Sequence, residues 1–121
     1  MYNQPINLDT KFAKFADLWS PKIIAKMNDY KITIVRVKGD FVWHKHDNTD
    51  DFFFVIEGTL RIDLEGKDSI YVKAGEVAVV KKGDVHKTYA ENECKIMLIE
   101  PMGTDNTGNA ETDRTAEEEW I

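Results

Sequence analysis

The stretch Gly39-Asp-Phe-Val-Trp-His44-Lys-His46-Asp-Asn-Thr-Asp-Asp51-Phe-Phe-Phe-Val-Ile-Glu-Gly58 decides how this sequence is interpreted. His44 and His46 end a strand-like run. Because successive side chains of a strand point to opposite faces, we expect both imidazoles on one face, with their Cα atoms about 7 Å apart. A turn after His46 would then bring a carboxylate back beside them. The two-residue period of the next strand selects Asp51 for this position and leaves Asp50 on the other face.

The remaining histidine of the chain, His86, follows a turn at Gly83-Asp84 and opens another strand-like run. In a closed barrel, strands far apart in sequence can meet across the interior. Three imidazoles and one carboxylate suit one divalent transition-metal ion (Fe, Mn, Ni, Co, Cu or Zn) better than Mg or Ca. Each piece alone has an ordinary explanation, as a solvent-exposed histidine or an acidic turn. Their joint placement predicts a metal site of His44, His46, Asp51 and His86.

Short apolar runs separated by turn residues fill the middle of the chain. Leu60, Ile62 and Leu64 alternate with polar residues and show the strand period most clearly. Many short strands at this spacing predict an all-β antiparallel sandwich or barrel. The expected strands are 22–27, 30–38, 41–46, 52–56, 59–64, 69–72, 77–80, 86–90 and 94–100, with a turn at Glu91-Asn92.

The two ends of the chain differ from this pattern. Apolar residues spaced by three and four predict a short amphipathic helix between Asn7 and Trp19, capped by Asp9 or Thr10 and ended by Ser20-Pro21. We therefore expect a helix and leading strand over 1–29, a barrel over 30–102 and an acidic tail over 103–121. The apolar end Trp120-Ile121 is either pinned to a groove, on its own barrel or on a second subunit, or frayed.

Composition limits the classes of function. A chain of 121 residues has room for one hydrophobic core. Its net charge of −6, without a basic run, offers nothing for a nucleic-acid backbone to bind. The sequence also contains no apolar run long enough to span a bilayer, so we expect a cytoplasmic protein without nucleic-acid or membrane partners. Cys94 is the single cysteine, which excludes an intramolecular disulfide and a cysteine-rich zinc site.

The two histidine stretches resemble the motifs of the cupins, specifically the small single-domain microbial cupins of type 2. The first cupin motif is matched by Gly39, His44, His46, Asp51 and Gly58, and the second by Gly75, Gly83 and His86, over about residues 30–102. Four features depart from the family pattern: four residues instead of five separate Gly39 from His44, Asp51 replaces a glutamate and is one methylene shorter, Lys81 replaces a proline, and Ala90 replaces an asparagine. The resemblance implies a double-stranded β-helix, that is, a jelly-roll barrel.

The resemblance also implies a wide range of functions. A metal-dependent enzyme acting on a small organic molecule, as a dioxygenase, isomerase, decarboxylase or lyase, is the first hypothesis. Tyr89 and Glu57 are its candidate proton-transfer residues, although the ordinary roles of a strand aromatic and a hairpin-end charge are favoured for them. The alternatives are a non-catalytic module that binds or senses a small ligand, and a barrel with vestigial histidines. A homodimer is expected, and Phe52 and Phe54, which point away from Asp51, either form its contact or pack under the helix.

Overall fold

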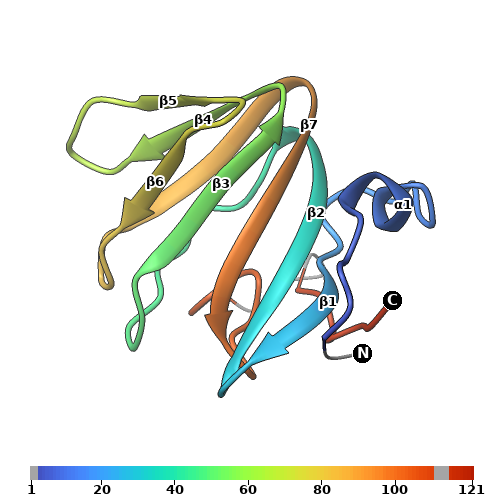
Figure 1. Ribbon diagram of the computed structural model, residues 1–121. Helices are drawn as coiled ribbons and strands as arrows, with labels where there is room; N and C mark the ends of the chain where they lie inside the picture. The colour runs from blue at the N-terminus through green and yellow to red at the C-terminus, as the bar shows by residue number, and fades with distance from the viewer. Residues whose placement is uncertain (1–2, 111–114) are drawn as a thin grey trace.

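The structure, a computed structural model, describes residues 3–110 and 115–121. In these ranges one short helix precedes seven strands that pair antiparallel (Figure 1). This confirms the predicted all-β jelly-roll with a short amino-terminal helix. The elements are α1 (Leu8–Phe12), β1 (Lys22–Met27), β2 (Tyr30–Asp40), β3 (Asp51–Glu57), β4 (Thr59–Leu64), β5 (Ile70–Lys73), β6 (Val77–Val80) and β7 (His86–Pro101).

The long strand β7 joins the two halves of one seven-stranded sheet. Its second half lies between β2 and β3 in the order β1-β2-β7-β3-β6, and its first half pairs with β4, which also pairs with β5. Figure 1 shows β7 bending over at the top of the molecule between these halves. The prediction of two strands separated by a turn at Glu91-Asn92 was therefore wrong. The register shift between Val37 and Gly39 lets the chain bend there without losing its pairing.

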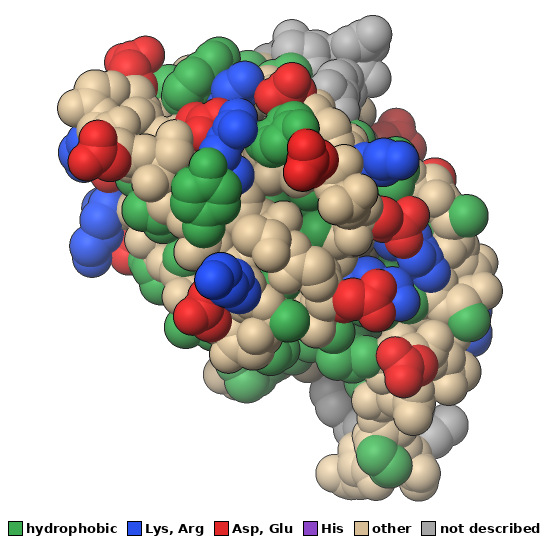
Figure 2. Space-filling view, turned by 90° about the horizontal axis from the view of Figure 1, so that it is seen from above, with side chains coloured by type: hydrophobic (Ala, Val, Ile, Leu, Met, Phe, Trp, Pro, Cys, Tyr) green, Lys and Arg blue, Asp and Glu red, His purple; other side chains and the backbone are tan. Residues whose placement is uncertain are grey.

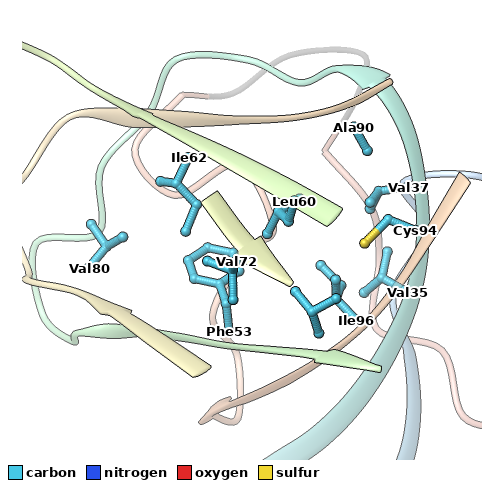
Figure 3. Packing of buried hydrophobic residues seen from close by; sticks show 11 residues of the cluster. Val35, Val37, Phe53, Leu60, Ile62, Val72, Val80, Ala90, Cys94 and Ile96 are labelled. Atoms are coloured by element: carbon cyan, nitrogen blue, oxygen red, sulfur yellow. The ribbon is translucent and has the colours of Figure 1, made fainter. Parts of the chain in front are cut away.

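The apolar core lies between the two halves of the sheet (Figure 3). Leu60 and Ile62 are fully buried, as their alternation predicts, and they face residues of β2, β3 and β7. Cys94 is also fully buried, in the second half of β7. The core residues are Val35, Val37, Phe53, Val55, Leu60, Ile62, Val72, Val80, Ala90, Cys94 and Ile96.

The helix is shorter than predicted, because it ends at Phe12 and does not continue to Trp19. The guanidinium of Arg36 donates hydrogen bonds to the carbonyls of Phe12 (2.8 Å) and Phe15 (3.0 Å), so these acceptors have a partner outside the helix. The cap is Asn7, whose side chain accepts from the Thr10 amide. Below the helix, Phe12 packs with residues of β1 and β2 in a second apolar cluster.

The end of the tail is pinned to its own barrel. Trp120 forms a parallel bridge with Ile23 of β1. Lys22 pairs with Glu119 at 2.7 Å and Lys31 pairs with Glu118 at 2.8 Å. Residues 1–2 and 111–114 of the predicted terminal regions lie outside the described residues. The boundaries at 29/30 and 102/103 stay predictions.

Charges of both signs are interleaved on the face that Figure 2 shows, where no histidine surface is visible. Over the described ranges, no helix has the length and apolar character needed to cross a membrane. The cytoplasmic location stays a prediction.

Candidate metal centre

The segment that carries the first two histidines runs beside the start of β7. His44 forms an antiparallel bridge with His86, with N···O distances of 2.9 and 2.8 Å, and the Phe41 amide donates to the Thr88 carbonyl at 3.0 Å. The predicted strand over 41–46 is thus reduced to a bridge at His44. The alternation it implied is nevertheless present, because His44 and His46 are buried while Lys45 between them is partly exposed.

The other two residues of the predicted site open strands. Asp51 is the first residue of β3 and His86 the first residue of β7. The turn before His86 is tied to the histidine segment, since the Gly83 amide donates to the His46 carbonyl at 2.7 Å. Gly83 has φ +85°, which a side chain would disfavour. The structure therefore brings three separate stretches of sequence to one place.

The four predicted metal-site residues form a buried cluster. One ligand atom from each of His44, His46, Asp51 and His86 lies within 4.8 Å of the other three. Oδ2 of Asp51 is 3.1 Å from Nε2 of His86 and 3.3 Å from Nε2 of His46. All four side chains are less than a tenth exposed. A group of this composition and spacing could hold a metal ion.

The second nitrogen of two imidazoles is already occupied by a backbone carbonyl. Nδ1 of His44 lies 2.9 Å from the Val42 carbonyl oxygen, and Nδ1 of His86 lies 2.9 Å from that of Asp84. A carbonyl can only accept, so each Nδ1 carries the proton and donates it. This arrangement directs Nε2 toward the cluster and fixes the ring orientation, as outer partners do in metal sites.

Burial and the neighbouring charges set the protonation of the cluster. Burial alone would raise the pKa of Asp51, but the hydrogen bonds with His46 and His86 outweigh it and lower this pKa to about 2. Burial lowers the pKa of His44 to about 4, with further lowering from the charges of His86 and His46. Burial would also lower the pKa of His46, but Asp51 raises it. One carboxylate thus stays ionised between two imidazoles, where a cation is favoured.

A pocket with largely apolar walls opens beside the cluster. His44, His46 and Asp51 line it, and its cavity measures about 40 Å³. The aromatic rings of Trp19 and Phe41 stack on each other at 4.7 Å between centroids and form part of the wall. The remaining lining residues are Pro21, Val35, Val37, Phe53, Thr88, Ile96, Leu98, Glu100 and Asn106. A cavity of this size suits a ligand of few non-hydrogen atoms.

Glu100 is a pocket residue that the sequence reasoning missed. Its side chain is 5% exposed, and burial raises its pKa to about 7, with a further increase from the charge of Asp51. Lys31 lies 3.7 Å away, but its Nζ forms shorter contacts of 2.8 Å with Glu118 and with the Thr104 carbonyl. The cation is thus shared among several acceptors, so it compensates the carboxyl of Glu100 only in part. The usable sequence signal was Ile96, Leu98 and Glu100 alternating on one strand face.

Tyr89 and Glu57, the candidate proton-transfer residues, do not join the cluster. The Tyr89 ring lies under the guanidinium of Arg61, 4.3 Å from centroid to Cζ, and lines a separate surface pocket. Glu57 is 64% exposed and lies 3.7 Å from Lys95. A register shift between Val55 and Glu57 interrupts the alternation that would have placed Glu57 on the face of Asp51. A catalytic role for these two residues stays a prediction from sequence.

Solved structures of two bacterial proteins resemble this chain closely. A cupin-2 domain containing protein from Shewanella frigidimarina is 51% identical, with a TM-score of 0.77, over 79% of this chain and 93% of that one. Protein NMB1881 from Neisseria meningitidis is 34% identical, with a TM-score of 0.74, over 81% of this chain and 99% of that one.

A curated relative and a family model complete the comparison. Uncharacterized protein YdbB of Bacillus subtilis (strain 168) is 35% identical over 65 residues, which are 54% of this chain and 58% of YdbB. The matched region thus spans less than two thirds of that relative. The cupin-domain model Cupin_2 matches residues 32–100, which include all four residues of the cluster. The fold, the paired motifs and this match agree: the chain belongs to the cupin family.

Proposed function

We propose that this cupin holds one divalent transition-metal ion on His44, His46, Asp51 and His86 and acts on a small, mostly apolar organic molecule in the adjacent pocket. The convergence of three imidazoles and one carboxylate at the wall of an apolar pocket carries the proposal. The donor set fits such an ion, because imidazole nitrogen suits Fe, Mn, Co, Ni, Cu and Zn. When bound, the ion supplies Lewis-acid or redox chemistry.

The pocket walls support a substrate that is largely apolar. Trp19, Phe41 and Phe53 present aromatic surface, and the neighbouring strand residues are aliphatic. Such walls exclude bulk water and strengthen every polar interaction made inside. The reaction class within this proposal is that of a dioxygenase, isomerase, decarboxylase or lyase, and a shared fold does not choose among them.

Glu100 is the best-placed residue for proton transfer within this proposal. It lines the same pocket as the metal cluster, and its carboxyl is nearly completely buried. In the metal-free protein, burial raises its pKa to about 7, and a buried carboxyl beside the reacting molecule is the kind of group that serves as a general acid or base. Its position favours it over Tyr89 and Glu57, which lie elsewhere.

Metal content and turnover test the proposal. Protein purified without a histidine tag is expected to contain close to one equivalent of a transition metal by elemental analysis. Small acids, sugars and phenols are then screened for thermal stabilisation and for conversion, including oxygen uptake with Fe(II). Turnover that is lost in His46→Ala supports the enzyme. An empty site that takes up none of the six candidate metals contradicts the proposal.

A non-catalytic binding module is the alternative. The positions of Tyr89 and Glu57 favour it, because neither of these predicted proton-transfer residues lines the pocket. Glu100 therefore has neither of them as a partner for acid–base catalysis. In this case every ligand found would be recovered unchanged with each candidate metal. Conversion of a ligand that depends on His46 would exclude the alternative.

We also propose a homodimer formed through the outer face of β3 and β6. Val77 and Val79 of β6 are 59% and 55% exposed, and they pair with Phe54 and Phe52 of β3. Within the described residues, neither phenylalanine belongs to the cluster under α1. A contiguous apolar patch of this kind is typical of an interaction surface. Sedimentation equilibrium at micromolar concentration is expected to give the dimer mass, and a monomer throughout would contradict the assignment.

A further inference from the structure

The residue between the two histidines is held by a segment far along the chain. Residues 104–110, here called the clamp, lie against Lys45. The Asn109 amide donates to the Lys45 carbonyl at 2.9 Å, and the Asn109 side-chain Oδ1 accepts from the Lys45 amide at 2.9 Å. Both backbone groups of Lys45 are thus satisfied by one residue of the clamp.

These bonds lie on the side of the histidine segment that the barrel does not reach. The backbone of His44 bonds to His86, and the carbonyl of His46 accepts from Gly83. Because alternate residues of an extended chain direct their backbone groups to opposite sides, Lys45 faces away from β7 and needs another partner. The clamp provides it, so the segment from His44 to His46 is fixed from both sides.

Close packing at Gly108 adds an independent constraint. A Cβ atom built on Gly108 would overlap the Lys45 carbonyl group and lie 3.1 Å from Cδ2 of His44. The glycine therefore lets the clamp backbone approach within contact distance of one histidine ring of the cluster. Gly108 also has φ +56°, whereas Gly103, in the same tail, has φ +86° and nothing within 4 Å of a built Cβ.

The clamp is itself anchored. Thr107 is fully buried, and its hydroxyl contacts that of Thr115. Oδ1 of Asn106 accepts from the Ala116 amide at 2.8 Å, and Asn106 lines the pocket beside the cluster. A firmly held segment can transmit its own position to the residues that it contacts.

From these contacts we infer that the clamp is a positioning element of the metal centre, in which Asn109 and Gly108 hold Lys45 and thereby fix the spacing and ring orientation of His44 and His46. This inference rests on the proposed metal-binding function. It assigns a role in the site to the acidic tail, whose residues supply none of the four donor atoms.

Co(II) alone is the probe, since its visible spectrum reports ligand geometry and a titration gives its affinity. Asn109→Ala and Gly108→Ala are expected to weaken Co(II) binding about tenfold, the size of effect typical of outer partners of metal ligands, and to change the visible band. Asn109→Asp keeps the acceptor oxygen and should restore the wild-type band. Gly103→Ala is the matched control for a residue at positive φ and should bind as the wild type does.

Two outcomes would overturn the inference, and they are separate from failure of the proposed function. If Asn109→Ala and Gly108→Ala lower the melting temperature but keep the Co(II) affinity and spectrum, the clamp is only structural. If the wild type binds no Co(II), the metal proposal fails. Imidazole ¹H–¹⁵N spectra of the metal-free protein then test whether the clamp fixes the rings of His44 and His46. Ring signals of His44 and His46 that shift in Asn109→Ala but not in Gly103→Ala support it, and unshifted signals reject it.

Discussion

Two parts of the barrel interior are built from the same alternating strands and filled with opposite chemistry. Around Leu60 and Val72, the side chains of the core cluster are apolar and nearly inaccessible. At the cluster, the inward positions carry three imidazoles and one carboxylate that are buried almost as deeply. Apolar burial stabilises the fold by about 25 cal/mol for each Å², whereas a buried ion pair at best recovers its desolvation cost. The first part therefore holds the fold together, and the second is present for what it binds.

The largest expected change comes from the apolar part. Leu60→Ala removes a fully buried side chain and leaves a cavity, so we expect the free energy of unfolding to fall by about 3 kcal/mol. Urea denaturation measures this loss. If the two parts are energetically separate, Co(II) affinity stays within about threefold of the wild type, well under 1 kcal/mol. A tenfold loss of Co(II) affinity in Leu60→Ala would show that the apolar core and the cluster are energetically coupled.

The reverse experiment removes one residue of the cluster. His86→Ala deletes one of the four candidate donors, and we expect Co(II) affinity to fall by at least about 100-fold, which is roughly 2.7 kcal/mol. Isothermal titration calorimetry provides the measurement. The control is Lys45→Ala, because this side chain is partly exposed and pairs with Asp47 at 3.2 Å outside the cluster. If both variants lost the same Co(II) affinity, the loss in His86→Ala would not come from the removal of a metal ligand.

A pH series of unfolding measurements on the metal-free protein tests Glu100, the pocket acid that lies among residues of both the apolar core and the cluster. The pKa of Glu100 rises from 4.5 to about 7 on folding. A raised carboxyl pKa costs no stability below pH 4.5, an increasing amount up to pH 7 and a constant amount above. Glu100→Gln should therefore gain stability relative to wild type as pH rises across this window, by up to about 3 kcal/mol.

Glu65→Gln is the control for the pH series, because Glu65 is exposed on the turn after β4. Its substitution should change the free energy of unfolding by no more than about 0.5 kcal/mol, as is usual for an exposed residue. A stability difference for Glu100→Gln that does not change with pH would mean that the Glu100 carboxyl titrates as in solution.

The smallest effect is expected outside the interior. Glu119 is 57% exposed where it pairs with Lys22, and Lys22 keeps a second partner in Asp17 at 3.0 Å. Glu119→Gln should cost about 0.5 kcal/mol, a loss that shrinks at high salt. Glu117→Gln, an exposed neighbour in the tail, serves as the control in thermal denaturation. A loss of unfolding free energy above about 2 kcal/mol would mean that this tail contact stabilises the fold as strongly as a core residue does.

Local patterns in the sequence predicted most of the strands. They also predicted three of the four residues of the metal site directly. The two-residue period of Leu60, Ile62 and Leu64 is a property of adjacent residues, so it can be read without knowing the fold. The histidine pair and Asp51 are likewise close in sequence. His86 was assigned to the same site because a closed barrel can bring distant strands together, and the resemblance to the cupin motifs also pairs it with them.

The features that the sequence reasoning missed depend on contacts between distant residues. The helix ends early because Arg36, from β2, takes up the carbonyls of Phe12 and Phe15. Glu57 leaves the face of Asp51 because of a register shift that only the pairing with β7 creates. Glu100 lines the pocket beside the cluster, and its pKa is raised by burial and by the charge of Asp51, a residue far from it in the sequence. Only Glu100 had a local signal, its alternation with Ile96 and Leu98 on one strand face. The early helix end and the register shift have none within one stretch of sequence.

The buried single cysteine, Cys94, can report when the barrel opens. Cys94 lies in the second half of β7 with no exposed surface, and burial raises its pKa to about 11. A thiolate-specific reagent such as a disulfide dye therefore reacts only after β7 separates from its neighbours. The labelling rate of the unmodified protein measures how often the sheet opens, and no engineered probe is needed.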